Sequence, residues 1–132
     1  MRGVYVLTIA VNRNIRVKVG ALGSVNFERG IYAYVGSAQN NLEKRVSRHL
    51  RRAKRRFWHI DYLLENAAVK VLKVFYNEAE RHCECDIARR IGDVGVPVEG
   101  FGSSDCRCKS HLFKLESDQF LTGFMREMVL AE

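Results

Sequence analysis

The sequence predicts a small α/β protein, an α+β sandwich in which a mostly antiparallel mixed sheet is flanked by helices. Short β-branched and aromatic runs alternate with segments whose apolar residues recur at helical spacing. The chain has 132 residues, which fits one domain with one core. Apolar residues make up 47% of it and charged residues 28%, as in soluble globular proteins. We therefore expect a single domain over residues 1–132.

The first third of the chain predicts three strands. Residues 4–11 (VYVLTIAV) are β-branched and aromatic, and residues 12–14 (NRN) are typical of a turn. Residues 15–22 (IRVKVGAL) alternate apolar and polar, which predicts an extra strand that forms an N-terminal hairpin with the first. Residues 31–36 (IYAYVG) predict the third strand, which Gly36 ends.

The middle of the chain predicts three helices and one further strand. A helix is expected over residues 42–53, a short one over 57–66 and a third over 78–93. Residues 68–76 (AVKVLKVFY) predict a strand between the last two helices, and residues 97–115 a long loop that ends in a short strand.

The C-terminal residues 116–132 predict an amphipathic helix that follows a core domain over residues 1–115. Ser117 offers an N-cap, and one apolar stripe follows it, made of Phe120, Leu121, Phe124, Met125, Met128 and Val129. The stripe either packs on the core or docks on a second copy of the chain or on a DNA-repair partner. Packing is the more common use of such a stripe.

Charge points to a polyanionic partner. The net charge is +7, and residues 44–56 (KRVSRHLRRAKRR) hold eight basic residues and no acids, whereas the rest of the chain has 14 basic against 15 acidic residues. A block of one sign is the footprint expected for a phosphate backbone. We expect nucleic-acid contacts from seven side chains: Lys44, Arg48, Arg51, Arg52, Lys54, Arg55 and Arg56.

A membrane is the weaker alternative for this block, which has little apolar face to insert. No apolar run approaches the roughly 18 to 20 residues that span a bilayer. The N-terminus (MRGVYVLTIAV) lacks the small-residue cleavage site of a signal peptide, so we expect a cytoplasmic protein with no membrane partner.

The corner between the third strand and the next helix predicts a phosphate site. Tyr34 and Gly36 end the strand, and Gly36 permits close approach of a ligand. Arg45 and His49 are four residues apart and share one helical face. A guanidinium can bind two phosphate oxygens and stays charged.

At these residues the sequence resembles the GIY-YIG nucleases. YVGSAQNNLEKRVSRH, residues 34–49, is similar to the second half of that family's pattern. GVYVL, YAYVGSA, WHIDYLL and GFGSSDC.C.SHLF together resemble a small archaeal and bacterial branch of the family, the DUF123-like proteins. The resemblance covers nearly the whole chain up to Leu115. It implies a GIY-YIG-like fold and a metal-dependent endonuclease that hydrolyses DNA in repair or in processing of branched or damaged DNA; RNA stays open as a substrate.

The family places one tyrosine on each of two adjacent strands. In GIYAYVG, residues 30–36, Tyr32 and Tyr34 lie on one strand and one face, so they cannot be that pair. The resemblance instead pairs Tyr5, in Gly3-Val4-Tyr5, with Tyr34, although an extra strand then separates the two halves. Tyr32 either packs in the core or contacts substrate, and packing is favoured. The turn residues of the site would be Gly3, Gly36 and Ser37.

The resemblance also implies the catalytic roles. One Mg²⁺ or Mn²⁺ ion would be held by Glu84, with Glu78 and Glu80 as the next choices. Tyr5 or Tyr34 would act as or orient the general base, its pKa lowered by Arg45 and the metal. Arg45 would stabilise the transition state, and His49 would relay a proton or only add to the basic surface.

The four cysteines do not predict a zinc site. Cys83 and Cys85 point about 200° apart on a helix, and C-x-C lacks the usual spacing of zinc ligands even with His82 and His111 nearby. We expect free thiols and no structural zinc; the alternative is one disulfide, Cys85 with Cys106 or Cys108.

Two polar segments keep two interpretations each. The FGSSDCRCKSHLF loop either locks against the sheet or borders the active site through Asp105, Ser110 or His111, and locking is favoured. For His59 and Asp61 the same two interpretations, a structural role or a place at the active site, are both open. The alternative to an endonuclease is a non-catalytic nucleic-acid-binding module or an accessory subunit on the same scaffold.

Overall fold

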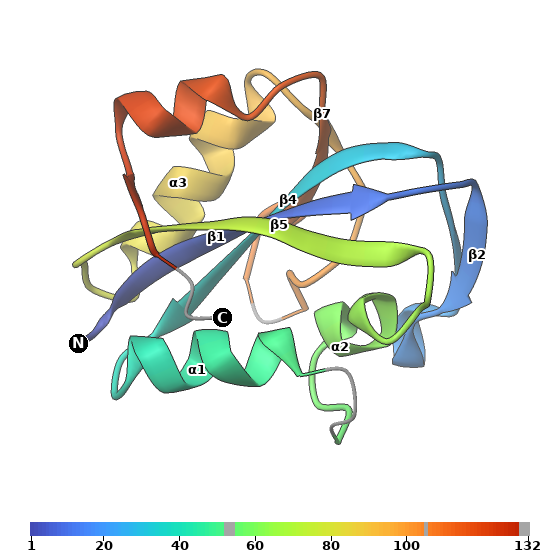
Figure 1. Ribbon diagram of the computed structural model, residues 1–132, viewed down its shortest axis with the longest axis horizontal. Coiled ribbons are helices and arrows are strands. Elements are labelled where there is room, and N and C mark those ends of the chain that lie inside the picture. Colours follow the sequence, from blue (N-terminus) through green and yellow to red (C-terminus); the bar gives the residue numbers. More distant parts are fainter. Residues whose placement is uncertain (52–54, 105, 130–132) are drawn as a thin grey trace.

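The computed structural model describes residues 1–51, 55–104 and 106–129, and the predicted α+β class is confirmed (Figure 1). The elements in chain order, with two 3₁₀ helices among them, are β1 (Gly3–Val11), β2 (Ile15–Lys18), a 3₁₀ helix (Gly20–Leu22), β3 (Ser24–Phe27), β4 (Gly30–Ala38), α1 (Leu42–Leu50), α2 (His59–Leu64), β5 (Val69–Asn77), α3 (Cys83–Gly92), β6 (Val96–Pro97), β7 (Leu112–Leu115), a second 3₁₀ helix (Gln119–Gly123) and β8 (Arg126–Glu127).

The main sheet has six strands in the order β6-β7-β4-β1-β5-β8, and every neighbouring pair is antiparallel. Helices α1 and α2 lie on one face of this sheet, and α3 with the second 3₁₀ helix lies on the other (Figure 1). Because both faces are covered, β1 is apolar at almost every position and nearly all of it is buried.

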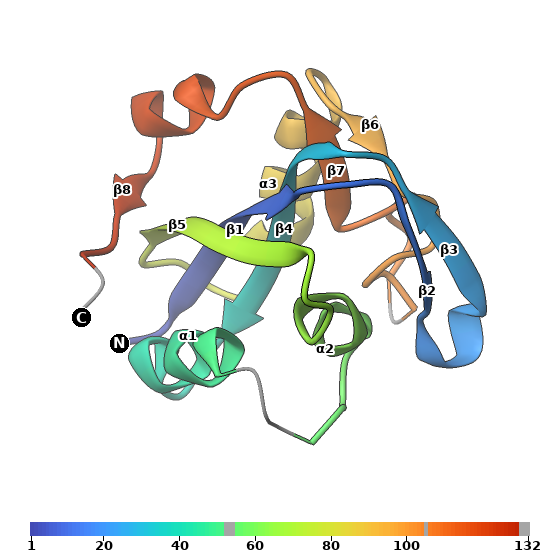
Figure 2. The ribbon, with the colours of Figure 1, turned by 45° about the vertical axis from the view of Figure 1, so that its right-hand side comes forward.

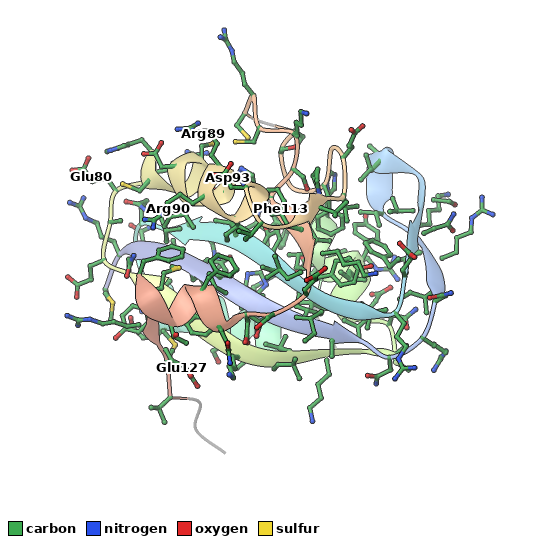
Figure 3. The ribbon with its side chains drawn as sticks, turned by 90° about the horizontal axis from the view of Figure 1, so that it is seen from above. Glu80, Arg89, Arg90, Asp93, Phe113 and Glu127 are labelled. Atoms are coloured by element: carbon green, nitrogen blue, oxygen red, sulfur yellow. The ribbon has the colours of Figure 1, made fainter. Side chains whose placement is uncertain are left out.

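Successive side chains of β1 point to opposite faces of the sheet, so the strand contributes to a core on each side. Tyr5, Leu7 and Ile9 pack toward α1 and α2, in one cluster with Leu42 and Val46. The alternate residues Val4 and Val6 pack with Ile87, Ile91 and Phe113 on the α3 side. In Figure 3, α3 and the second 3₁₀ helix lie across this face. Phe113 lies near one end of α3, and Glu80 lies near the other end.

The predicted hairpin between residues 4–11 and 15–22 is wrong. The two edges of β1 are taken by β4 and β5, so β2 pairs with β3 instead, in a separate two-stranded sheet at one end of the molecule (Figure 2). The alternation of β2 is explained by Ile15 and Val17, which pack against the core while Arg16 and Lys18 face outward. The extra strand thus leaves β1 and β4 adjacent.

The C-terminal amphipathic helix is also wrong. A short 3₁₀ helix ends at Gly123, and the chain then pairs as β8 with the open edge of β5. Glycine is a poor residue for a helix interior, and the free edge of β5 offers backbone partners instead. Leu121 and Met125 are buried in the core, whereas Val129 is 94% exposed, so no continuous helical docking face forms here.

The other boundaries differ modestly. Helix α1 ends at Leu50, and the backbone of Arg51 is already extended. Helix α3 begins at Cys83, because β5 continues to Asn77 and the chain then needs a turn to reverse its direction. No helix in the described part of the chain is both long and apolar enough to cross a membrane.

Candidate functional site

A cleft of about 930 Å³ lies at the end of the sheet where β4 leads into α1. Its floor is formed by β1 and β4, one wall by α1 and the turn before α2, and the other by the start of α3 and the loop before β7. The residues that line it are Tyr5, Tyr34, Gly36, Ser37, Ala38, Gln39, Asn40, Asn41, Lys44, Arg45, Arg48, Arg51, Phe57, Trp58, His59, Arg81, Glu84, Gly102 and Ser104.

The two tyrosines expected from the sequence meet at the floor of this cleft. In the β1–β4 register, Tyr5 lies opposite Gly36 and Leu7 opposite Tyr34, so the tyrosines are diagonal neighbours on one face. A Cβ at position 36 would collide with the ring of Tyr5. Gly36 is therefore required by the tyrosine across the strand pair. Tyr32 is buried, and its hydroxyl donates to the Glu28 carbonyl at 2.7 Å, which agrees with the packing interpretation.

His49 lies directly behind Tyr5. The Tyr5 hydroxyl and His49 Nε2 are 2.6 Å apart, and His49 is buried. Burial raises the pKa of Tyr5 far above its ordinary value, and the charge and hydrogen bond of Arg45 oppose this only in part. Burial likewise raises the pKa of Tyr34. Both phenols are therefore neutral near pH 7, and the Tyr5 hydroxyl shares a hydrogen bond with His49 Nε2 whose direction depends on the tautomer of His49.

Arg45 lies in the first turn of α1. Asn41 caps the N-terminus of this helix, because its side chain accepts a hydrogen bond from the Lys44 amide. The Arg45 guanidinium donates to the Ser37 carbonyl at 3.0 Å and lies 4.5 Å above the Trp58 ring. These contacts fix the charge of Arg45 beside Tyr5 and leave it facing the cleft.

Arg48, which is partly exposed, forms an ion pair with the buried Asp61. Arg48 donates to both carboxylate oxygens at 3.0 Å, and Asp61, which is 1% exposed, also accepts the amides of Phe57 and Trp58 at 2.8 and 3.0 Å. Burial alone would raise the pKa of Asp61, but Arg48 and the two amides hold it below its usual value. Asp61 thus has a structural role, because it holds the turn that places Phe57 and Trp58 at the cleft.

His59 also faces the cleft, from the first turn of α2. Its Nδ1 accepts the Gly102 amide at 2.9 Å, which ties α2 to the loop before β7. Burial lowers the pKa of His59, so the neutral form that accepts this bond is favoured.

The predicted basic stretch divides in the structure. Lys44, Arg48 and Arg51 line the cleft, whereas Arg55 and Arg56 do not, and the side chain of Arg56 pairs with Glu65 at 2.8 Å. Arg52 and Lys54, like Asp105, lie outside the described residues.

Spacing along the chain could not reveal several other cleft residues. Arg81, Phe57 and Ser104 come from segments other than the helix that carries Arg45, and the WHID segment contributes Trp58 and His59. Five lysine and arginine side chains among the described residues line the cleft, against one acidic side chain, that of Glu84.

The expectation of Mg²⁺ or Mn²⁺ held by Glu84, with no structural zinc, is wrong. Cys85, Cys106, Cys108 and His111 place their ligand atoms within 4.8 Å of one another, which fits a thiolate and imidazole site of the zinc type. Cys83 packs against the core and lies outside this cluster, whereas Cys85 finds its partners in the loop before β7, about twenty residues further along the chain. The four cysteines are free, so the alternative disulfide is not formed.

Comparison with known proteins identifies a family. The sequence model of a domain of unknown function, DUF123, matches residues 4–131. No curated protein and no solved structure matches the chain.

Proposed function

Since the chain belongs to the DUF123 family, a GIY-YIG-like family of unknown function, we propose that its cleft binds nucleic-acid phosphodiesters and hydrolyses them. The observation that carries this proposal is the composition of the cleft. Five cations surround a floor that presents the Tyr5 hydroxyl, and that hydroxyl is hydrogen-bonded to His49. A concave site with one sign of charge concentrates a polyanion, and a hydroxyl–imidazole pair can move a proton.

Each group has a definite part in this hydrolysis. Arg45 binds a non-bridging phosphate oxygen and stabilises the charge that builds up in the transition state. The Tyr5–His49 pair accepts the proton of the attacking water. As the new P–O bond forms, the bond to the leaving oxygen breaks, and that oxygen takes a proton from solvent. Lys44 and Arg51 contact neighbouring phosphates without reading sequence.

The rim of the cleft favours nucleic acid with unpaired bases. Phe57 is 68% exposed and Trp58 is 37% exposed, and the Arg45 and Arg48 guanidinium groups lie over the Trp58 ring at 4.5 and 4.6 Å. Exposed aromatic rings next to a cationic groove are used to stack bases of single strands, and the more exposed Phe57 ring is better placed for this than Trp58, which the two guanidinium groups cover. We therefore propose branched or damaged DNA as the substrate class, with single-stranded RNA as the alternative that the same chemistry admits.

A second candidate function is a binding module without catalysis. Burial raises the pKa of both cleft tyrosines, which makes neither phenol a ready base at neutral pH. On that proposal the cleft holds phosphates and the Tyr5–His49 hydrogen bond only fixes the floor.

Cleavage of a branched DNA that carries an unpaired segment separates the two functions. Wild-type protein should cut it, with and without added divalent ions compared in parallel. Tyr5→Phe should retain DNA binding and cut at least about 100-fold more slowly, because proton transfer contributes about 10²- to 10⁴-fold. Arg13→Ala removes one charge from a turn outside the cleft and should cut like wild type. Binding without any cleavage by wild type would establish the module, and equal cutting by Tyr5→Phe would remove Tyr5 from the reaction.

A further inference from the structure

We propose that Cys85, Cys106, Cys108 and His111 bind one zinc ion and that Glu84, at the edge of the cleft, orients the ligand His111. The four residues offer three thiolates and one imidazole, a common ligand set of structural zinc. The proposal does not depend on nuclease activity, since metal binding can be measured with no nucleic acid present.

Two edges of the cluster match a tetrahedral site. His111 Nε2 lies 3.4 Å from Cys106 Sγ and 3.8 Å from Cys85 Sγ. With Zn–N near 2.0–2.1 Å and Zn–S near 2.3 Å, a tetrahedron requires an N···S edge of about 3.6 Å. The two observed edges fall on either side of that value. All ligand atoms lie within 4.8 Å of one another, whereas a tetrahedral S···S edge is about 3.8 Å, so the thiolates would close around the ion as it binds.

The site joins two segments that are distant along the chain. Cys85 comes from the first turn of α3, and the other three ligands come from the loop before β7. His111 is already fixed at the sheet, because its amide donates to the Phe101 carbonyl at 2.8 Å and its carbonyl accepts the Val35 amide at 2.9 Å. Zinc would tie the rest of the loop to α3, a device that small domains use to stabilise irregular chain.

The position of Glu84 supports a role as the outer partner of this centre. Nε2 of His111 faces the sulfur atoms, which places Nδ1 on the opposite side of the ring, 3.6 Å from Glu84 Oε1. A metal-bound histidine commonly directs its second ring nitrogen to a carboxylate, which fixes the tautomer and the ring orientation. Glu84 also lines the cleft, so the zinc centre and the cleft share this carboxylate. On this proposal Glu84 orients a zinc ligand.

The ligands are reachable. A groove of about 530 Å³ is lined by Cys85 and Cys108, which gives an ion a route to the site. Three thiolates and one Zn²⁺ leave a net charge of −1. Arg107 and Lys109 line the same groove beside Asp93, and Arg89, which also lines it, pairs with Asp86.

Metal content and Co²⁺ spectroscopy of the full chain test the ligand set. We expect one zinc per chain in the purified protein, and Co²⁺ reconstitution should give the charge-transfer and d–d bands of a tetrahedral thiolate site. Cys106→Ser should lose or markedly weaken these bands, whereas Cys83→Ser, the helix neighbour outside the cluster, should keep them. Wild-type protein that binds no zinc on reconstitution under reducing conditions would overturn the proposal. So would an equal loss in Cys83→Ser, or a disulfide within the cluster in protein isolated without oxidation.

Zinc affinity, measured by chelator competition, tests the part of Glu84. Glu84→Gln should bind zinc about 10- to 100-fold more weakly, which is the usual effect of removing an outer-shell partner. Glu80→Gln is the matched control, because Glu80 is exposed and contacts Arg2 and His82 instead of a cluster residue. Equal affinity of Glu84→Gln and Glu80→Gln would refute the link between Glu84 and the zinc centre while leaving the ligand set intact.

Discussion

Replacing Asp61 by asparagine tests how the cleft wall is held. The carboxylate accepts four hydrogen bonds: Oδ1 takes one from Arg48, and Oδ2 takes one from Arg48 and one each from the amides of Phe57 and Trp58. In Asp61→Asn an amide oxygen can still accept three of them. The amide nitrogen then faces the fourth donor, that of Arg48, and can accept nothing from it.

The expected loss of stability follows from these contacts. Hydrogen bonds to a charged acceptor contribute about 1.5 to 3 kcal/mol each, against about 0.5 to 1.5 for neutral ones. Weakening three bonds and losing the fourth at a partly buried ion pair should lower the free energy of unfolding by about 1.5 to 3 kcal/mol, the contribution of one hydrogen bond to a charged acceptor.

Urea denaturation of wild type, Asp61→Asn and Glu65→Gln at neutral pH measures this difference. Glu65→Gln breaks an exposed pair with Arg56 and should leave the midpoint near the wild-type value. The folded pKa of Asp61 lies below its unfolded value of about 3.9, so its contribution is complete above that pH and is lost as the pH falls through the folded pKa. The gap between wild type and Asp61→Asn should therefore shrink in acid. A change below about 0.5 kcal/mol at neutral pH would refute the assigned role of Asp61.

Three further predictions concern the floor and walls of the cleft. Gly36→Ala should destabilise the protein by about 1 to 3 kcal/mol in urea denaturation, because the new Cβ displaces the Tyr5 ring. Arg45→Ala should lower the slope of log binding constant against log salt by about 1 in a DNA titration, since one phosphate contact is lost. His59 should titrate below about 6.5 by NMR, and the Gly102 amide resonance should move with it, because protonation of Nδ1 removes the acceptor of that amide. The stability that this hydrogen bond contributes is present above about pH 6.5 and is lost as the pH falls through the folded pKa.

Matched measurements show how each of these would fail. Gly123→Ala meets no atom within 4 Å and should be nearly neutral, so equal effects of Gly36→Ala and Gly123→Ala would argue against the collision. Arg13→Ala should leave affinity near the wild-type value, and an equal reduction of the slope by Arg13→Ala and Arg45→Ala would indicate binding without a defined site. A His59 midpoint above 6.5 would contradict the bond to Gly102.

The central strands and first helix could be predicted because their signals are local. The runs that form β1 and β4 are β-branched and aromatic, and Leu42 and Val46 recur at helical spacing. The spacing of Arg45 and His49 predicts one shared helical face, and both lie beside Tyr5, a residue that the resemblance and not the spacing indicated. These features depend on neighbours within a few residues.

The features that could not be predicted depend on contacts between distant segments. The pairing of β2 with β3 follows from the occupation of both edges of β1, and the loss of the C-terminal helix follows from the free edge of β5. Arg48 looked like a phosphate ligand because no local pattern shows its partner Asp61. The zinc-type cluster joins Cys85 to a loop twenty residues later, so the spacing within each C-x-C pair gave the wrong answer.

Backbone NMR during titration with a single-stranded oligonucleotide shows whether the cleft is the nucleic-acid site. The amide shifts should concentrate on the cleft, at Gly36, Gln39, Arg45 and Gly102, and residues 15–27 of the separate two-stranded sheet should stay unchanged. Shifts centred on that sheet, or no saturable shifts at low salt, would contradict the assignment of the cleft as a nucleic-acid site.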